Sequence, residues 1–408
     1  MYSRRELLFK AAKCGSLAGC AAVTLSHGVW ESLIRDAEAR NRLDDLIRSA
    51  PRARFWTSAA AASKNCAPCH GPGVPPNRTP GKDHGKNIKC LLCAQGCMLQ
   101  DGQRGGCRAR INVSGEMRSL VYGRPVSVHV DPIEKKPFYH FLPGSAAFSL
   151  ATSGCPLHCK FCQNWEISQS RPEDFQAEYV APGEIVSAAR SRQATVIAFT
   201  YNEPTVFTEY LTDIARSAKS ERIRSVMISC GFMNEAPLTE ICSLLDAIKI
   251  DLKGFDEAFY RNVCSAELRP VLRSIKQIAA SRVHLEIVNL VVPTLNDSEK
   301  MLGDLSAWIA EELGSDVPVH FTRFHPDYQL LNLPPTPVST LEKAREIAMK
   351  RGIRYAFVGN VPGHAGNNTY CPNCGKAVIK RSAFFVEEMN LKRGQCKFCN
   401  TKIAGVWN

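Results

Sequence analysis

The sequence predicts an α/β protein built on a partial (β/α)6 parallel barrel, with a cysteine-rich region before it and a zinc-ribbon-like module after it. Six apolar runs alternate with segments of helical patterning, and these runs lie at 148–153, 196–201, 225–230, 247–252, 285–292 and 318–324. Strands that alternate with helices form parallel βαβ units with right-handed connections. The functional groups should then lie at the carboxyl ends of the strands.

Composition and cysteine spacing narrow the class of protein. The 408 residues are 45% hydrophobic and 22% charged, which excludes a disordered or fibrous chain and leaves room for two or three domains. The net charge of +12 is spread along the chain, so it predicts a solvated basic surface rather than a nucleic-acid site. The 18 cysteines include short-spaced clusters, which are typical of metal or iron–sulfur ligation and not of a disulfide framework.

Residues 1–30 resemble an export signal. They contain the pair Arg4-Arg5, as in twin-arginine signals, and Leu17-Ala18-Gly19-Cys20, as in a lipoprotein cleavage site. Lys10 and Lys13 interrupt the apolar run, so it is too short for a stable membrane-spanning helix. The alternative is an amphipathic helix with an accidental arginine pair.

Residues 31–87 are expected to form a helix and then a linker rich in Pro and Gly. The linker contains Cys66-Ala67-Pro68-Cys69-His70, which matches the attachment pattern of a c-type haem. A haem also needs a packed pocket, and this mostly polar segment does not predict one. A zinc ion or an unliganded cysteine pair is therefore expected here instead of haem.

The most specific motif is the C-x3-C-x2-C spacing of Cys155, Cys159 and Cys162, directly after the first apolar run of the barrel. Three thiolates from one loop can hold a cluster of four irons and leave one iron without a protein ligand. An open coordination position is what a catalytic metal centre requires. The alternative is a zinc site that His158 completes.

This spacing is the signature of the radical-SAM superfamily, and the chain most resembles the radical-SAM member of the AmmeMemoRadiSam system, a relative of pyruvate formate-lyase-activating enzymes. The similarity covers roughly residues 88–408. Besides the three cysteines, the residues that carry it lie at 120–125, 129–137, 162–165, 201–205 and 359–364.

The resemblance implies a [4Fe–4S] cluster on the three cysteines, whose open iron binds the amino and carboxylate groups of S-adenosylmethionine. An electron from the reduced cluster then breaks a C–S bond of the sulfonium and yields a 5′-deoxyadenosyl radical for hydrogen abstraction. A low-potential donor such as flavodoxin or ferredoxin is implied, and Phe161, the aromatic residue before the third cysteine, is expected to contact the cofactor. Kinship suggests activation of a glycyl-radical enzyme, while the substrate, protein or small molecule, stays open.

The fourth apolar run carries alternating charges. Lys249, Asp251 and Lys253 occupy every second position, so they share one face of the strand and are expected to point into the barrel. There Lys253 would face the carboxylate of S-adenosylmethionine and Asp251 its amino or ribose groups. The alternatives are a strand at the edge of the sheet, or a Lys–Asp pair that needs no ligand.

Two further cofactor contacts are expected at strand ends. Pro204 stops the second run and leaves Asn202 and Glu203 at its tip. The resembling family binds the methionyl amino group near here, usually with a Gly-Gly-Glu-type segment, so Glu203 carries over more safely than Asn202. His325, after the last run, is a weaker candidate for the ribose and could equally be a packed histidine.

Two sets of four cysteines flank the barrel. Cys371, Cys374, Cys396 and Cys399 form two C-x-x-C pairs, which predict a structural zinc site or a rubredoxin-like iron site. Cys90, Cys93, Cys97 and Cys107 could hold zinc or an auxiliary iron–sulfur cluster. The expected segments after the linker are therefore 88–142 around the first set, 143–365 for the barrel and 366–408 for the ribbon.

Two other functions remain open from the sequence. The signal-like start and the Cys66–His70 motif suggest an exported haem and iron–sulfur electron carrier. The basic ribbon suggests a nucleic-acid-binding protein, although no aromatic residues interleave with its charges for base stacking. A radical enzyme favours the cytoplasm, where S-adenosylmethionine and low-potential reductants occur, with export or membrane association as the alternative.

Overall fold

The computed structural model describes residues 41–59 and 86–408. The predicted signal at 1–30 and the Cys66–His70 motif lie outside these residues. The chain divides into two units at residue 45, and the account below concerns the second unit, Leu46–Asn408. No helix in the described part of the chain combines the length and the apolar composition that crossing a membrane requires.

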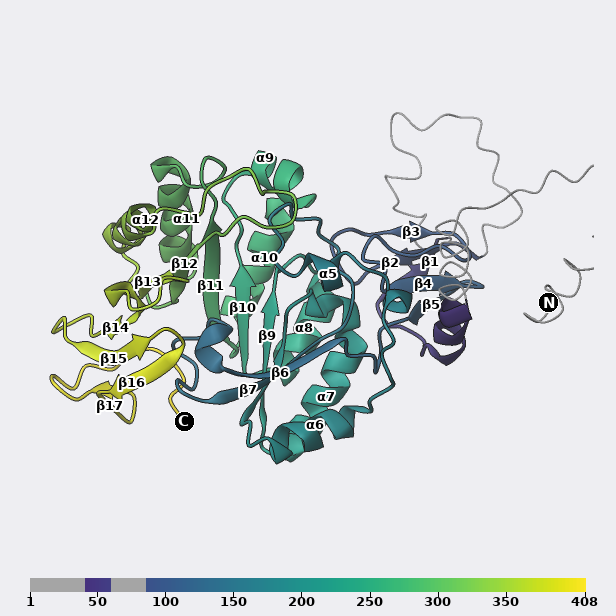
Figure 1. Cartoon of the computed structure of the whole chain (residues 1–408), viewed down its shortest axis with the longest axis horizontal. Coiled ribbons are helices and arrows are strands. Elements are labelled where there is room, and N and C mark those ends of the chain that lie inside the picture. The colour runs from purple at the N-terminus through teal and green to yellow at the C-terminus, as the bar shows by residue number, and fades with distance from the viewer. Residues whose placement is uncertain (1–40, 60–85) are drawn as a thin grey trace, which may run out of the picture. The chain divides into compact units, whose positions relative to one another are not determined.

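The centre of the unit is an eight-stranded sheet (Figure 1). Its strands lie side by side in chain order: β6 (Ser127–Pro132), β7 (Ala146–Ala151), β8 (Val196–Phe199), β9 (Arg224–Ser229), β10 (Ala247–Asp251), β11 (His284–Val291), β12 (Val319–Arg323) and β13 (Ala356–Gly359). Strands β7 to β13 are parallel, and β6 pairs antiparallel with β7. The six predicted runs are β7 to β12, and the parallel arrangement is confirmed.

The predicted number of parallel strands was too low by one. β13 adds a seventh, and it consists of only four residues, Ala-Phe-Val-Gly. A run this short carries no periodic signal that separates it from a helix or a loop. The alternative reading of 247–252 as an edge strand is also wrong, since β10 pairs with β9 on one side and with β11 on the other.

Helices connect the parallel strands and cover one face of the sheet with apolar side chains. The main ones are α6 (Pro182–Ser191), α7 (Thr208–Ser220), α8 (Glu235–Leu244), α10 (Leu268–Ala279), α11 (Glu299–Glu312) and α12 (Val338–Lys350), with shorter turns at α5 (Trp165–Ser168) and α9 (Glu257–Phe259). On α7, for example, Tyr210, Leu211 and Ile214 recur at helical spacing and are fully buried. Phe148, Ile197 and Phe199 meet this helical layer from the sheet.

The opposite face of the sheet is closed at one end by the segment after β6. Ile133, Phe138 and Phe141 pack against small side chains of the strands, namely Ala147, Val196, Ala198, Val226 and Ala247. Along each strand, these small side chains alternate with the side chains that face the helices, so the two faces of the sheet form separate cores. The closed end leaves the carboxyl ends of the parallel strands as the place for a site.

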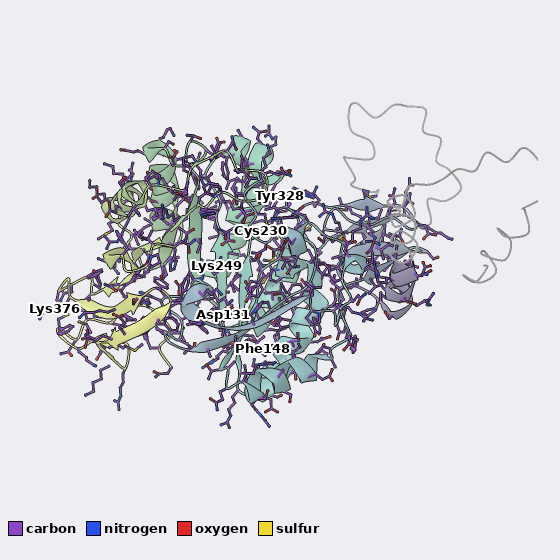
Figure 2. All side chains as sticks on the ribbon, viewed as in Figure 1. Asp131, Phe148, Cys230, Lys249, Tyr328 and Lys376 are labelled. Carbon is purple, nitrogen blue, oxygen red and sulfur yellow. The ribbon has the colours of Figure 1, made fainter. Side chains whose placement is uncertain are left out.

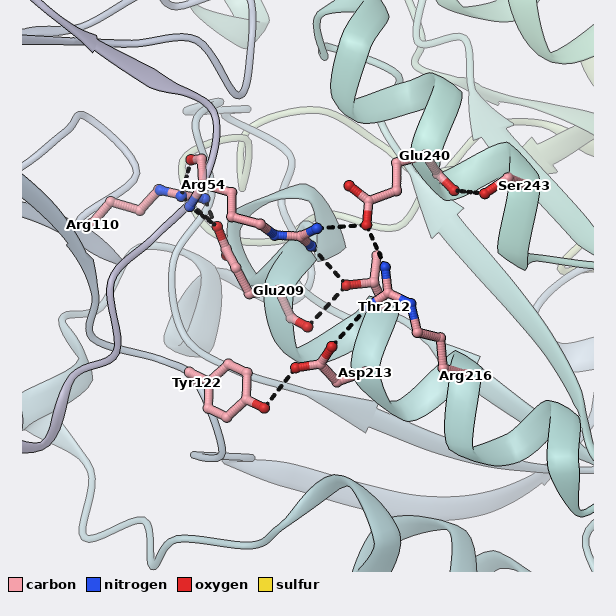
Figure 3. Close-up of polar contacts among 9 residues, drawn as sticks. All are labelled: Arg54, Arg110, Tyr122, Glu209, Thr212, Asp213, Arg216, Glu240 and Ser243. Carbon is pink, nitrogen blue, oxygen red and sulfur yellow. Dashed lines mark hydrogen bonds and ion pairs between the residues drawn. The ribbon is translucent and has the colours of Figure 1, made fainter.

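Before the sheet, short strands form a cysteine-bearing layer. β1 (Trp56–Ser58), β2 (Ile88–Cys90) and β3 (Met98–Leu99) make an antiparallel sheet, and β4 (Arg110–Val113) pairs with β5 (Glu116–Ser119). Figure 3 shows how this layer is fixed to α7 and α8. Arg110 pairs with Glu209 at 2.6 Å, and Arg54 pairs with Glu240 at 2.5 Å.

The C-terminal strands form a small module against the far edge of the sheet. They are β14 (Thr369–Tyr370), β15 (Ala377–Ser382), β16 (Phe385–Met389), β17 (Leu391–Lys392) and β18 (Gln395–Cys396). The module packs on Tyr139, Tyr355 and Phe357. His140 donates from Nδ1 to the carbonyl of Ala404 at 2.6 Å, so a buried polar contact also fixes the module.

Candidate active site

The loop that carries the three predicted cluster cysteines follows β7 and is fixed by main-chain hydrogen bonds. His158 N and Lys160 N donate to the carbonyls of Cys264 and Val263, each at 3.0 Å. Gly154 begins the loop with a φ of +95°, a backbone conformation that glycine adopts without strain. These main-chain contacts hold the loop in a defined shape.

Cys155, Cys159 and Cys162 line one cavity of about 400 Å³ at the carboxyl ends of the parallel strands. Its walls include residues from β9, β10, β11 and β12, and from the segment that follows β8. This volume falls within the usual range of about 300–1,000 Å³ for small-molecule sites. The cavity therefore has the position and size of a cofactor site.

The spacing of the three thiols fits a cluster better than a single ion. Within the described residues, only the C-terminal cysteines bring three or more possible ligand atoms within 4.8 Å of one another. The thiols of Cys155, Cys159 and Cys162 therefore do not form a group close enough together to hold one ion. Thiolates that each bind a different metal atom need wider spacing than thiolates around one ion, so the chemistry of this donor set fits a polynuclear iron–sulfur cluster.

The local environment changes the acidity of these thiols unequally. Burial raises the pKa of Cys155 and Cys162. A hydrogen bond with the Cys264 thiol lowers the pKa of Cys159 despite its burial. Burial alone lowers the pKa of Lys253, but the neighbouring Cys159 thiolate and Asp251 carboxylate raise it well above its usual value. Lys253 therefore stays an ammonium beside the cysteine loop.

The alternating charges at 249, 251 and 253, within β10 and two residues beyond its end, line the cavity, as the sequence predicts. Lys249, Asp251 and Lys253 all line it, and Lys249 forms an ion pair with Asp251. Lys253 Nζ lies 3.7 Å from Asp251 Oδ2 and 5.6 Å from the centre of the Phe161 ring. The Lys–Asp pair thus exists without a ligand, and the three side chains together carry one excess positive charge.

Glu203 lies four residues after the end of β8, where it caps the short helix Pro204–Phe207, and is 2% exposed. Its Oε1 accepts hydrogen bonds from Ser229 Oγ at 2.8 Å and Thr205 N at 3.1 Å, and its Oε2 accepts one from Cys230 N at 2.8 Å. All these donors are neutral. Among the residues that the structure describes, no lysine or arginine forms an ion pair with Glu203, so its charge has no cationic partner.

Asn202 contacts the cysteine loop. Its Nδ2 donates to the carbonyl of Gly154 at 2.9 Å, and it lines the same cavity as Glu203. Its Oδ1 is buried and has no hydrogen-bond partner within the described part of the chain. Asn202 therefore ties β8 to the cysteine loop and keeps an acceptor available.

His325 is not brought together with the other predicted residues. Its side chain is exposed, its Nδ1 contacts the adjacent Pro326 carbonyl at 2.9 Å, and it does not line the cavity. The geometry gives no support to its predicted contact with the ribose.

Sequence reasoning gave no site role to a charged cluster on the cavity wall. Asp131 on β6 accepts from Lys136 Nζ at 2.5 Å and from Tyr201 Oη at 2.6 Å, and both partners line the cavity. Burial lowers the pKa of Lys136 to about 8. Figure 2 labels Asp131 of this cluster, and also Lys249 and Cys230, which line the cavity. The signal in the sequence was Lys135-Lys136, two adjacent lysines in the short segment after β6.

The C-terminal cysteines form a second centre with different geometry. The four Sγ atoms all lie within 4.8 Å of one another, with Cys371 and Cys399 at 3.5 Å and Cys374 and Cys396 at 3.8 Å. A tetrahedral ion with metal–sulfur bonds of about 2.3 Å places its sulfurs about 3.8 Å apart. The set therefore fits one tetrahedral metal ion, zinc or iron. A hydrogen bond with the Thr401 side chain lowers the pKa of Cys399 to about 5.

The N-terminal cysteines are also brought together. Cys90, Cys93, Cys97 and Cys107 line a small enclosed cavity together with Arg110. Burial raises the pKa of Cys90, Cys93 and Cys107, the last to about 11. Unlike the C-terminal set, no three of these thiols lie within 4.8 Å of one another.

Comparisons with known proteins agree with this geometry. Residues 149–305 match the family model described as the radical SAM superfamily. An uncharacterized protein of Methanocaldococcus jannaschii is 42% identical over 318 residues, which cover 78% of this chain and 95% of that protein. The pyruvate formate-lyase-activating enzyme of Clostridium pasteurianum is 24% identical over 157 residues, which cover 38% of this chain and 65% of that enzyme.

Solved structures resemble the chain more distantly. A domain of a pyruvate formate-lyase-activating enzyme from Bacteroides vulgatus superposes with a TM-score of 0.36 at 19% identity. The superposition covers 40% of this chain and 98% of that domain. SuiB of Streptococcus suis superposes with a TM-score of 0.42 at 10% identity. The superposition covers 56% of this chain and 52% of that protein.

Proposed function

Because this chain belongs to the radical SAM superfamily, whose members cleave S-adenosylmethionine reductively, we propose that Cys155, Cys159 and Cys162 hold its [4Fe–4S] cluster. The observation that carries the proposal is that three thiols, spaced too widely for one ion, line a single cavity at the strand ends. When bound, the cluster supplies an electron to the sulfonium and an open iron that binds the methionyl group. The chain's own residues bind, orient and enclose the cofactor.

The charges of the cavity suit a zwitterion. Glu203 is a buried carboxylate that only neutral donors contact, so an ammonium group would supply the missing countercharge. Lys249, Asp251 and Lys253 leave one positive charge, which suits a carboxylate. We therefore assign the amino group of S-adenosylmethionine to Glu203 and its carboxylate to Lys253.

Other side chains have positioning roles in this proposal. Glu203 holds the loop after β9 through Ser229 Oγ and Cys230 N. Asn202 holds the cysteine loop through the Gly154 carbonyl, and its free Oδ1 suits a hydroxyl donor of the ribose. Together these contacts fix the cavity walls before the cofactor binds, which lowers the ordering cost of binding.

The decisive experiment is cofactor cleavage under anoxic conditions. The full chain is reconstituted with iron and sulfide, reduced with dithionite and incubated with S-adenosylmethionine, and 5′-deoxyadenosine is quantified by chromatography. Replacing all three cysteines of the loop with alanine should abolish the product. Cys242→Ala, at a partly exposed cysteine on α8, is the matched control. Undiminished product from the triple variant would refute the assignment.

The reaction that we propose is hydrogen abstraction, with activation of a glycyl-radical enzyme as its specific form. Its support is the similarity to the activating enzyme of C. pasteurianum over 157 residues. Pyruvate formate-lyase is the test substrate, and the expected product is a glycyl radical detected by electron paramagnetic resonance. No radical alongside normal 5′-deoxyadenosine formation would leave cofactor cleavage standing and remove this substrate.

We place the activity in the cytoplasm, because the cofactor and its low-potential donors are found there. Flavodoxin and ferredoxin are the proposed donors. Fractionation of the native host tests the location, and recovery of the chain only from the membrane or the periplasm would contradict it.

A further inference from the structure

We propose that Cys90, Cys93, Cys97 and Cys107 bind a second iron–sulfur cluster, which passes electrons to the cluster of the Cys155–Cys162 loop. The existence of this second cluster stands on its own geometry. Its role as an electron relay rests on the proposed function.

The four cysteines come from a compact arrangement of short strands and turns. Cys90 ends β2, Cys97 directly precedes β3, and Cys90 N donates to the Cys97 carbonyl at 2.9 Å. Gly106 N approaches Cys97 Sγ at 3.5 Å, one residue before Cys107. All four side chains line one enclosed cavity, whose remaining walls include Leu92, Leu99 and Met117. An enclosed apolar pocket with four inward thiols is a built site for a thiophilic metal.

The spacing favours several metal atoms over one. The same chain provides an internal standard, since the thiols at Cys371–Cys399 lie within 4.8 Å of one another as a single tetrahedral ion requires. No three of the N-terminal thiols meet that distance. Thiolates that each bind a different iron are held further apart, so these four cysteines fit an iron–sulfur cluster of two or four irons.

A buried arginine gives an independent sign of a bound ligand. Arg110 lines the same cavity, is 1% exposed and pairs with Glu209 on α7 (Figure 3). Its Nε has no hydrogen-bond partner among the described residues, although buried donors are almost always paired. A sulfide or thiolate of a cluster in this cavity would accept that hydrogen bond, and such bonds raise the reduction potential of a cluster.

The second site shares a wall with the first. Pro156, Thr205 and Val206 line the N-terminal cavity, whereas Cys155, Leu157 and Glu203 line the cofactor cavity. The two sites therefore lie on opposite sides of the same two chain segments. At Gly154 the main chains touch, because a Cβ there would lie 2.3 Å from the carbonyl oxygen of Cys107. Cys107 is thus in direct main-chain contact with Gly154, the residue before Cys155.

The four thiolate ligands of the second cluster and its position beside the first site together indicate a role in electron transfer. Four protein thiolates leave no iron open for a substrate, which is typical of electron-transfer clusters. A reduced donor of the ferredoxin or flavodoxin class gives one electron to the second cluster and is oxidised by one electron. The second cluster then reduces the open cluster by one electron and returns to its oxidised state. No bond is formed or broken and no proton moves in these two steps.

The existence of the cluster is tested in the full chain with Cys155, Cys159 and Cys162 all replaced by alanine. After anoxic reconstitution, this variant should retain iron and acid-labile sulfide in equal amounts. Reduction should give a paramagnetic signal that does not change on addition of S-adenosylmethionine. Bound zinc with no sulfide, or no metal at all, would overturn the proposal and leave the proposed function untouched.

The relay is tested with the three-cysteine loop intact. Cys97→Ser should keep the response of the open cluster to S-adenosylmethionine, while 5′-deoxyadenosine formation driven by reduced flavodoxin falls by about tenfold or more. Cys242→Ser is the control, and its rate should match that of the unaltered chain. An unchanged flavodoxin-driven rate in Cys97→Ser would overturn the relay.

A measurement on the unaltered chain covers the case in which Cys97→Ser fails to fold. Rapid freezing after mixing with reduced flavodoxin should show the signal of the second cluster before that of the open cluster. The reverse order would contradict the relay.

Discussion

Gly154→Ala tests the contact that joins the two cysteine sites. Gly154 has a φ of +95°, and its added Cβ would lie 2.3 Å from the Cys107 carbonyl oxygen and 3.3 Å from the Ala109 Cβ. A non-glycine residue in such a conformation costs about 1–3 kcal/mol. The contact with a backbone oxygen adds to this, because no side-chain rotation can relieve it.

The size of the required movement predicts the functional result. Real Cβ contacts essentially never fall below 3.0 Å, so the distance must grow from 2.3 to 3.0 Å, a shift of about 0.7 Å. Metal and catalytic sites tolerate displacements of about 0.5 Å. The movement must fall on the loop of Cys155, on Cys107, or on both. We therefore expect Gly154→Ala to lower the iron content and the rate of S-adenosylmethionine cleavage, as well as the melting temperature.

Gly314→Ala is the matched control. Gly314 follows α11 with a φ of +94°, nearly the same as at Gly154, but a Cβ there would meet nothing within 4 Å. Both variants pay the backbone cost, and only Gly154→Ala adds the contact. Iron content, 5′-deoxyadenosine formation and thermal unfolding are measured for both variants under anoxic conditions. If Gly154→Ala matched Gly314→Ala in all three, the close contact between the two sites would be refuted.

Four side chains give further predictions. Glu203→Gln places an amide donor against Ser229 Oγ or Cys230 N, which are themselves donors, so we expect the stability to fall by about 1–3 kcal/mol. We also expect weaker binding of S-adenosylmethionine in equilibrium dialysis. Unchanged binding would contradict the assigned contact. Burial lowers the pKa of Lys136 to about 8. Between pH 8 and the pKa of this lysine in the unfolded chain, the unfolded chain binds more protons than the folded chain, so the free energy of unfolding rises with pH. Lys136→Met should remove this slope in urea unfolding. Burial lowers the pKa of His140 from 6.5 to about 3. The free energy of unfolding should therefore decrease as the pH is lowered from 6.5 towards 3, by at most about 1.4 kcal/mol per pH unit. His140→Gln should flatten this profile. A chelator that removes the metal of the C-terminal set should lower the melting temperature, and Cys374→Ser, already without the metal, should show no further decrease.

The parts of the site that the sequence predicted are those encoded by local spacing. The three cysteines of the loop lie within eight positions, and the alternation in 249–253 fixes which side chains share a face of a strand. Both patterns are independent of how distant segments pack. For the same reason the parallel order of β7 to β12 followed from the alternation of strands and helices.

What the sequence could not predict depends on partners far apart in the chain. Arg110 and Glu209 lie 99 positions apart, and neither is distinguished from a surface charge until the fold brings them together. Cys264 lies outside the short-spaced cysteine clusters of the sequence, yet its thiol hydrogen-bonds with Cys159. The position of His325 after β12 suggested the cavity, yet its side chain is exposed and does not line the cavity.

The cysteine-bearing front of the chain has a consequence for any attempt to isolate the barrel by truncation. A fragment that began at residue 143 would lose β6, which forms one edge of the main sheet. It would also lose Arg110 and leave the Glu209 carboxylate, 6% exposed, without its cation. Breaking a buried ion pair in this way costs about 3–5 kcal/mol, a large share of the 5–15 kcal/mol that stabilises a typical domain. We therefore expect such a fragment to be strongly destabilised, so a minimal fragment of the barrel should retain the front layer.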